Sequence, residues 1–148
     1  DLSRGTEEIS RFAESNTRLR IWKSSLQIVQ KSFFLGVGTG DIKDELKTKY
    51  SQNSDEEAYD LNLNCHNQFL ETFVGQGLIG FLLLILTLFF PLLSNNNRYK
   101  QLLVFFIIIV VVNFIFESML NTIAGVVFFA YFYPLLNLNS LKQSANLF

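Results

Sequence analysis

The sequence predicts an all-α, polytopic integral membrane protein with three transmembrane helices and an external helical loop segment. Two observations predict this fold class. Of the 148 residues, the first 66 hold 9 of the 12 Lys and Arg residues and 11 of the 13 Asp and Glu residues. The remaining residues form three long, almost uncharged apolar runs. Because a water-soluble domain mixes charged and apolar residues along its length, this separation indicates a polar segment joined to a membrane segment.

The apolar runs place the expected spanning helices at residues 74–93, 101–116 and 120–137. A hydrocarbon layer about 30 Å thick needs roughly 20 helical residues, which the first run supplies alone and the second only with its flanks. Backbone groups in lipid must bond within their own segment, so these runs are predicted as helices despite their β-branched residues. The chain therefore divides into an external segment, 1–66, and a transmembrane segment with a short cytoplasmic tail, 67–148.

The short loops between the apolar runs predict the topology. The first loop, SNNNRYKQ, carries Arg98 and Lys100, whereas the second, ESMLNT, carries Glu117 and no cation. The excess of cations places the first loop in the cytoplasm, so His66 and Glu117 are expected at the opposite, external face. Because an external segment must be delivered across the membrane, we expect the chain to be the C-terminal piece of a longer polytopic protein. Its upstream transmembrane helices would then pack against these three.

The external segment is expected to contain amphipathic helices. Residues 6–32 are predicted to be helical, with Thr6 and Thr17 as caps of two helices. Their apolar stripe is expected to consist of Leu19, Trp22, Leu26 and Val29.

The second part of the external segment is predicted to be less regular. Three alternate glycines, at 36, 38 and 40, predict a turn, after which Asp41 can cap a short helix to Tyr50. The acidic stretch 51–64 has no apolar period and is expected to be a solvated loop. Glycines at 75, 77 and 80 are expected to allow close helix packing in the first span. No turn signal separates them from His66, which is therefore expected at the external mouth of that span.

Composition excludes several classes of function. A net charge of −1 gives no basic field for nucleic acid, so we expect no nucleic-acid partner. The single histidine, His66, and the single cysteine, Cys65, exclude a multi-histidine metal site within the chain and an internal disulfide. The alternate glycines have neither a preceding strand nor the following Lys-Ser/Thr of a nucleotide loop. We therefore expect no metal and no cofactor.

The order of several short motifs carries a family resemblance. The motifs are Arg18-Leu-Arg-Ile-Trp22, then Gly36-Val-Gly38-Thr-Gly40, Tyr50, His66-Asn67-Gln-Phe-Leu70, Gly75-Gln-Gly77-Leu-Ile-Gly80 and finally Glu117. In this order they resemble the C-terminal region of the O-antigen ligase and O-antigen polymerase family of bacterial membrane glycosyltransferases. The resemblance covers roughly residues 17–135.

This resemblance implies a substrate class and a location. The donor would be a glycan carried on undecaprenyl diphosphate, used at the periplasmic face of the bacterial inner membrane. A ligase transfers the glycan to the lipid A core, and a polymerase transfers it to another repeat unit, in both cases without a metal or nucleotide. His66 matches the family histidine proposed to act on the acceptor, and Arg18 matches the arginine associated with the diphosphate.

The residues themselves suit these roles to different degrees. A neutral imidazole can accept a proton from a sugar hydroxyl, which makes His66 a candidate catalytic base with Asn67 beside it. Arg18 and Arg20 are two residues apart on a helix and point to different sides, so one can bind the diphosphate and the other need not. Glu117 is either an exposed turn residue or a partner that orients His66 or an arginine. We take Arg18, Arg20, Asn67 and Glu117 as candidate substrate-binding residues.

Three classes of function remain open from the sequence. The leading hypothesis is a ligase that transfers a glycan with inversion, with a polymerase as the alternative within the same class. A polysaccharide transporter subunit would also be polytopic, but it would line its helices with polar residues, whereas His66, Arg18 and Glu117 gather at one face. A non-catalytic membrane anchor would use the external segment to bind a partner. In each case we expect the 148 residues to be inactive in isolation.

Overall fold

The computed structural model describes the backbone of residues 2–93 and 99–145, and the side chains of residues 16–93 and 99–137. Within these residues the chain forms helices and no strand, which confirms the all-α prediction. The elements are α1 (Leu2–Lys31), α2 (Ile42–Gln52), α3 (Glu56–Asp60), α4 (Gln68–Phe89), the 3₁₀ helix η1 (Phe90–Leu93), α5 (Lys100–Phe116), the 3₁₀ helix η2 (Met119–Asn121) and α6 (Ile123–Ala145).

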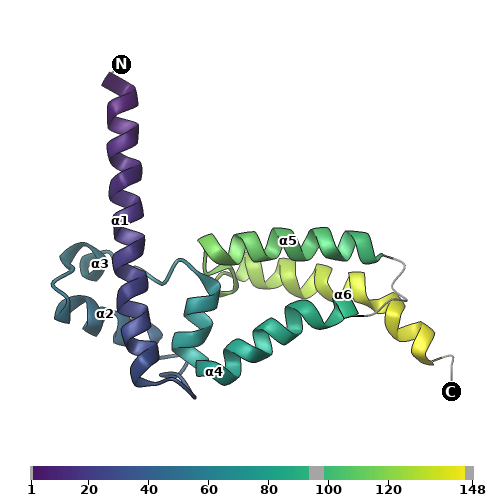
Figure 1. Ribbon diagram of the computed structural model, residues 1–148. Coiled ribbons are helices and arrows are strands. Elements are labelled where there is room, and N and C mark those ends of the chain that lie inside the picture. Colours follow the sequence, from purple (N-terminus) through teal and green to yellow (C-terminus); the bar gives the residue numbers. More distant parts are fainter. Residues whose placement is uncertain (1, 94–98, 146–148) are drawn as a thin grey trace.

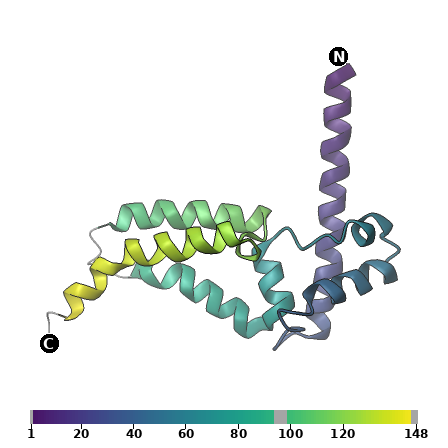
Figure 2. The same cartoon turned by 180° about the vertical axis from the view of Figure 1, so that it is seen from behind.

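The helices form two groups that run in different directions. The later part of α4, α5 and α6 run alongside one another, whereas α1 runs across them (Figures 1 and 2). Helices α2 and α3 lie beside α1, to its left in Figure 1, whereas α5 and α6 lie to its right. The polar segment and the apolar segment of the sequence thus form separate parts of the structure, joined through the first turns of α4.

Helix α1 is continuous through Thr17, so the prediction of a second helix capped there was wrong. The predicted apolar stripe was also partly wrong, because Leu19 and Leu26 are 59% and 50% exposed. The buried face instead follows Ile21, Ser24, Ser25, Ile28 and Val29. Two serines interrupt this face, so the spacing of apolar residues alone predicted a different stripe.

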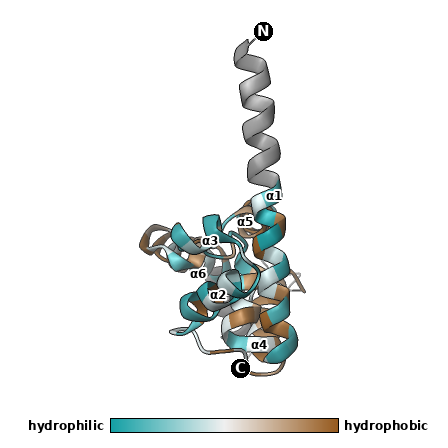
Figure 3. Cartoon of the chain, turned by 90° about the vertical axis from the view of Figure 1, so that its left-hand side faces the viewer, coloured by the Kyte–Doolittle hydropathy of each residue, from teal (hydrophilic) through white to brown (hydrophobic). Residues whose placement is uncertain are grey.

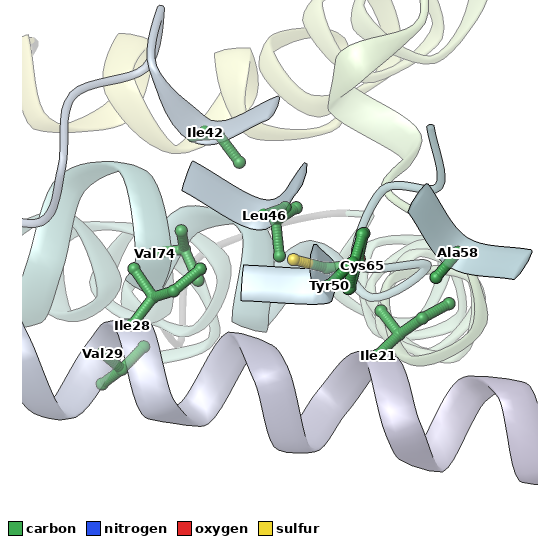
Figure 4. Packing of buried hydrophobic residues seen from close by; sticks show 9 residues of the cluster. All are labelled: Ile21, Ile28, Val29, Ile42, Leu46, Tyr50, Ala58, Cys65 and Val74. Carbon is green, nitrogen blue, oxygen red and sulfur yellow. The ribbon is translucent and has the colours of Figure 1, made fainter. Parts of the chain in front are cut away.

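The buried face of α1 packs on a small core formed with its neighbours (Figure 4). Leu46 and Tyr50 of α2, each 1% exposed, lie in this core beside Ile21 of α1. Val74 of α4 and Cys65 from the preceding segment also belong to it, both at 0% exposure. The polar segment and the start of α4 therefore share a core, which fixes the segment that leads into α4.

The acidic stretch 51–64 contains a helix, contrary to the prediction of a solvated loop. Helix α2 continues to Gln52, and α3 follows after a short link; hydrophilic residues cover much of both (Figure 3). Asp55 is only 8% exposed, and its carboxylate accepts a hydrogen bond from the backbone N–H of Ala58 at the start of α3. Asp55, one of the acidic residues that indicated a solvated loop, is therefore the N-cap of a helix.

Helix α4 bends at Gly77, where φ is 65° and ψ is −162°. Of the three glycines near the start of the predicted span, Gly77 makes this bend, whereas Gly75 allows close packing with α2, because a Cβ there would lie 2.6 Å from Cδ1 of Ile42. The straight apolar segment begins after the bend, at 78, instead of at 74 as predicted. Residues 78–93 comprise twelve α-helical and four 3₁₀ residues, which together extend roughly 25 Å.

The other two apolar runs are also helical. Helix α5 matches the predicted 101–116 closely, and α6 begins three residues after the predicted start at 120. Among the described residues, one helical segment, Gln68–Leu93, is long and apolar enough to cross a membrane, and α5 and α6 are shorter apolar helices. Three membrane crossings therefore stay a prediction. The cytoplasmic placement of Arg98 falls outside the described residues.

Candidate functional site

His66 lies directly before α4 and faces the end of α5. Its Nδ1 is 3.3 Å from Oε2 of Glu117, a residue 51 positions later in the chain. Its backbone is in the left-handed region, with φ of 44°, and its N–H donates to Oδ1 of Asn64 at 3.0 Å. A backbone in this conformation costs about 1–3 kcal/mol and is held by its surroundings, as is common at functional sites. The structure thus brings together the two residues that the topology placed on one face.

Asn67 is the N-cap of α4 and uses both of its polar side-chain atoms within the chain. Its Oδ1 accepts from the N–H of Leu70 at 3.0 Å, which begins the helix. Its Nδ2 donates to the carbonyl of Ile115 at 3.1 Å, two residues before Glu117. Asn67 therefore fixes the end of α5 beside His66, and a direct contact of Asn67 with substrate stays a prediction.

Two further polar residues of α4 hold the segment that follows α5, and the sequence analysis missed both. Glu71 is 4% exposed and accepts hydrogen bonds from the N–H of Cys65, Oγ of Ser118 and Nδ2 of Asn121, at 3.1, 3.3 and 2.8 Å. Oε1 of Gln68 accepts from the N–H of Leu120 at 2.7 Å.

A signal for these two residues exists in the sequence. Gln68, Glu71 and Thr72 have the i, i+3, i+4 spacing of one helix face, and all three are buried. A polar face at the start of an otherwise apolar helix indicates that polar groups from another segment pack against it.

Trp22 connects α1 to the residue beside His66. Its indole Nε1–H donates to the carbonyl of Cys65 at 3.1 Å. Arg18 precedes Trp22 by one helical turn, so both side chains lie on the same side of α1. The half-buried Arg18 is therefore on the face of α1 that approaches the 65–66 segment.

Arg20 lies about 200° around α1 from Arg18, and its guanidinium forms ion pairs with two carboxylates. Its Nε is 3.0 Å from Oδ2 of Asp55, and its Nη2 is 2.6 Å from Oε2 of Glu57. The hydrogen bonds that the Arg20 guanidinium donates to Asp55, and then to Glu57, raise its pKa. Arg20 thus attaches α3 to α1, and its contact with substrate stays a prediction.

The buried Cys65 and Tyr50 are neutral structural groups. Burial, followed by the nearby charge of Glu71, raises the pKa of the Cys65 thiol, and its Sγ is 3.2 Å from Oγ of Ser25. Burial also raises the pKa of Tyr50, whose hydroxyl donates to the carbonyl of Leu63 at 3.1 Å. Neither group is suited to act as a nucleophile near neutral pH.

A polar hollow of about 440 Å³ lies between the start of α2, the first half of α4 and η2. Asn64 and Gln68, which flank the His66–Asn67 pair, are among its lining residues. Other polar groups in the lining include Lys43, Glu71, Gln76 and Asn121. Hydroxyl, amide and carboxylate groups of this kind can bond the hydroxyls of a sugar.

Comparison with protein families gives a match over residues 4–85 to the model described as O-antigen ligase. The match covers more than half of the chain. The chain belongs to the O-antigen ligase family. The matched region contains Arg18, Trp22 and His66, whereas Glu117 lies beyond it. No curated protein and no solved structure matches the chain.

Membership of the O-antigen ligase family indicates a ligase- or polymerase-type activity and association with a membrane. It also implies, in general terms, a lipid-linked glycan and the lipid A core as partners. The pairing of His66 with Glu117 gives this activity a candidate centre in the present chain.

Proposed function

We propose that the chain transfers a glycan from undecaprenyl diphosphate to the lipid A core, with inversion and without a metal, at the periplasmic face of the bacterial inner membrane. The observation that carries the proposal is the pairing of His66 with Glu117 at the start of α4. The hydrogen bond from Trp22 to Cys65 adds the face of α1 that bears Arg18. Upstream helices of a longer protein would complete the site.

His66 acts as the base on the acceptor. With its Nδ1–H directed at the Glu117 carboxylate, the imidazole keeps Nε2 unprotonated and able to take a proton. The acceptor hydroxyl gives its proton to Nε2 while its oxygen forms a bond to the anomeric carbon. The bond from that carbon to the diphosphate oxygen breaks, and its electron pair leaves with undecaprenyl diphosphate. Glu117 stabilises the imidazolium that results.

Arg18 binds the diphosphate. Its planar guanidinium can bond two phosphate oxygens at once and stays charged as negative charge develops on the leaving group. Arg20 is less suited to this role because Asp55 and Glu57 already bond its guanidinium.

The test of the base is the substitution His66→Ala in the full-length protein, measured as glycan transfer from lipid-linked donor in membranes. A general base contributes roughly 10²–10⁴ in rate, so we expect a loss of at least about a hundredfold. Thr48→Ala, at an exposed position of α2, is the matched control and should transfer normally. Near-normal transfer by His66→Ala would exclude the proposed base.

The two arginines can be separated by the same assay. Arg18→Lys keeps the charge but loses the bidentate geometry, so transfer should fall sharply. Arg20→Lys should retain much more activity, because it changes a contact between α1 and α3. Supplying lipid A core or a second lipid-linked repeat unit as acceptor distinguishes a ligase from the alternative, a polymerase.

A further inference from the structure

We propose that the turn of residues 33–35, Phe-Phe-Leu, inserts into the external leaflet of the bilayer and anchors the external segment there. This goes beyond the transfer reaction, since it assigns a lipid-binding role to a non-helical part of the external segment. It rests on three features of the turn: its depth, its surface and its backbone hydrogen bonds.

The depth of the turn follows from its attachment to the bend in α4. The carbonyls of Phe33 and Phe34 accept hydrogen bonds from the N–H groups of Leu78 and Ile79, the first residues after the bend. From that point, residues 78–93 extend roughly 25 Å, slightly less than the hydrocarbon thickness of about 30 Å. If this segment spans the bilayer, its first residues lie at the edge of the hydrocarbon. The turn is bonded to those residues and lies at the same edge.

The surface of the turn is apolar. Phe33, Phe34 and Leu35 are 43%, 66% and 75% exposed, and no charged residue occurs between Lys31 and Asp41. A turn that faces water normally carries polar residues. Three consecutive exposed large apolar side chains indicate contact with an apolar environment instead.

This apolar surface continues onto α4. The ring of Phe33 packs against that of Phe73, at 5.4 Å between centroids, and Phe73 stacks on Phe81 at 5.2 Å. Beyond the bend, Ile79 and Leu82 are 53% and 55% exposed. The turn therefore extends the surface of the candidate membrane span, which favours lipid as its occupant.

Two carbonyls of the turn and the N–H groups of the three residues after it are hydrogen-bonded within the chain, which lowers the cost of contact with lipid. Irregular backbone is tolerated at membrane depth only where its polar groups are satisfied. Besides the two carbonyls bonded to α4, the N–H of Gly36 donates to Ser32, and those of Val37 and Gly38 donate to the carbonyls of Val74 and Gly75. The side chains of the turn can thus enter lipid while these backbone groups stay paired.

The experiment measures the environment of a nitroxide label at Leu35→Cys in the full-length protein. The protein is reconstituted into vesicles of phosphatidylethanolamine and phosphatidylglycerol, and collisions with oxygen, which concentrates in lipid, are compared with collisions with a water-soluble nickel chelate. Leu82→Cys on α4 is the lipid reference, and Tyr59→Cys on α3 is the water reference. Cys65 is fully buried and serves as the unlabelled background.

We expect the oxygen-to-nickel ratio at Leu35 to approach that at Leu82 and to exceed that at Tyr59 several-fold. A ratio like that at Tyr59 would overturn the proposal, because the turn would face water. Low collision rates with both reagents would also overturn it, since an upstream helix would then cover the turn. Phe34→Cys provides a second position, and the transfer assay is independent of either result.

Discussion

The substitution Gly77→Ala tests whether the turn of residues 33–35 imposes the bend in α4. Gly77 has φ of 65° and ψ of −162°, a region that essentially only glycine occupies. A Cβ there would collide with the carbonyl carbon and oxygen of Phe34 and would lie 2.6 Å from the N of Gly36. An alanine must therefore change the backbone conformation and displace the turn.

The expected loss of stability follows from these contacts. Displacing the turn breaks the bonds of Leu78 and Ile79 to the turn, at about 1 kcal/mol each. The bonds of Val37 and Gly38 to Val74 and Gly75 also hold the turn region on α4, and losing one of them costs about 1 kcal/mol. A straighter helix with alanine instead of glycine recovers about 1 kcal/mol. We therefore expect Gly77→Ala to lower the free energy of unfolding by about 2–3 kcal/mol, or roughly 30- to 150-fold in the equilibrium constant.

The assay is a reversible titration from mild detergent micelles into sodium dodecyl sulfate, followed by far-ultraviolet circular dichroism. Gly40→Ala is the matched control, because a Cβ at Gly40 meets no atom within 4 Å. It should be neutral or slightly stabilising, by up to about 1 kcal/mol. If the two variants unfold at the same detergent fraction, docking of the turn does not hold the bend, and the reasoning is wrong.

Three further predictions concern the site and its support. Glu117→Gln should slow transfer about fivefold with little change in stability, because the Glu117 side chain is 58% exposed and such pairs contribute up to about 1 kcal/mol; transfer kinetics measure this. Trp22→Phe removes the bond to the Cys65 carbonyl and should lower the free energy of unfolding by about 1 kcal/mol in the detergent titration. Burial raises the pKa values of Cys65 and Tyr50, so the stability from their neutral forms is complete below the unfolded values, about 8.5 and 10, and is lost at higher pH. Unfolding titrations from pH 7 to 11 should therefore show declining stability, with a shallower decline near pH 9 for Cys65→Ala.

The sequence predicted best the helices that consist almost entirely of apolar residues. Helix α5 lies within an apolar run whose surroundings favour one secondary structure, so its bounds matched the prediction to within one residue at the start. The buried face of α1 was predicted only in part, because Ser24 and Ser25 occupy it and each is hydrogen-bonded within the structure. Helix α3 was missed because a carboxylate such as Asp55 is normally solvated. Here it is paired with Arg20, which lies 35 residues earlier and cannot be matched to it from the sequence.

The same distinction applies to the candidate site. The spacing of apolar runs was enough to put His66 and Glu117 on one face, because a membrane restricts where the chain can turn. It could not place them 3.3 Å apart, since that distance depends on contacts of Asn67, Gln68 and Glu71 with the link between α5 and α6. Such contacts join residues about 50 positions apart, and the only sign of them in the sequence is a polar face on one helix.

The bend in α4 explains how one helix contributes both to the apolar segment and to the candidate site. Its first nine residues carry the polar face of Gln68 and Glu71, which must stay bonded because both side chains are buried. A straight α4 would continue the direction of the apolar segment and carry this face away from the link between α5 and α6. The break at Gly77 turns the first half across the later helices (Figure 1), where Glu71 reaches Ser118 and Asn121. Since Glu71 also bonds the N–H of Cys65, the position of His66 depends on the bend as well as on its own loop.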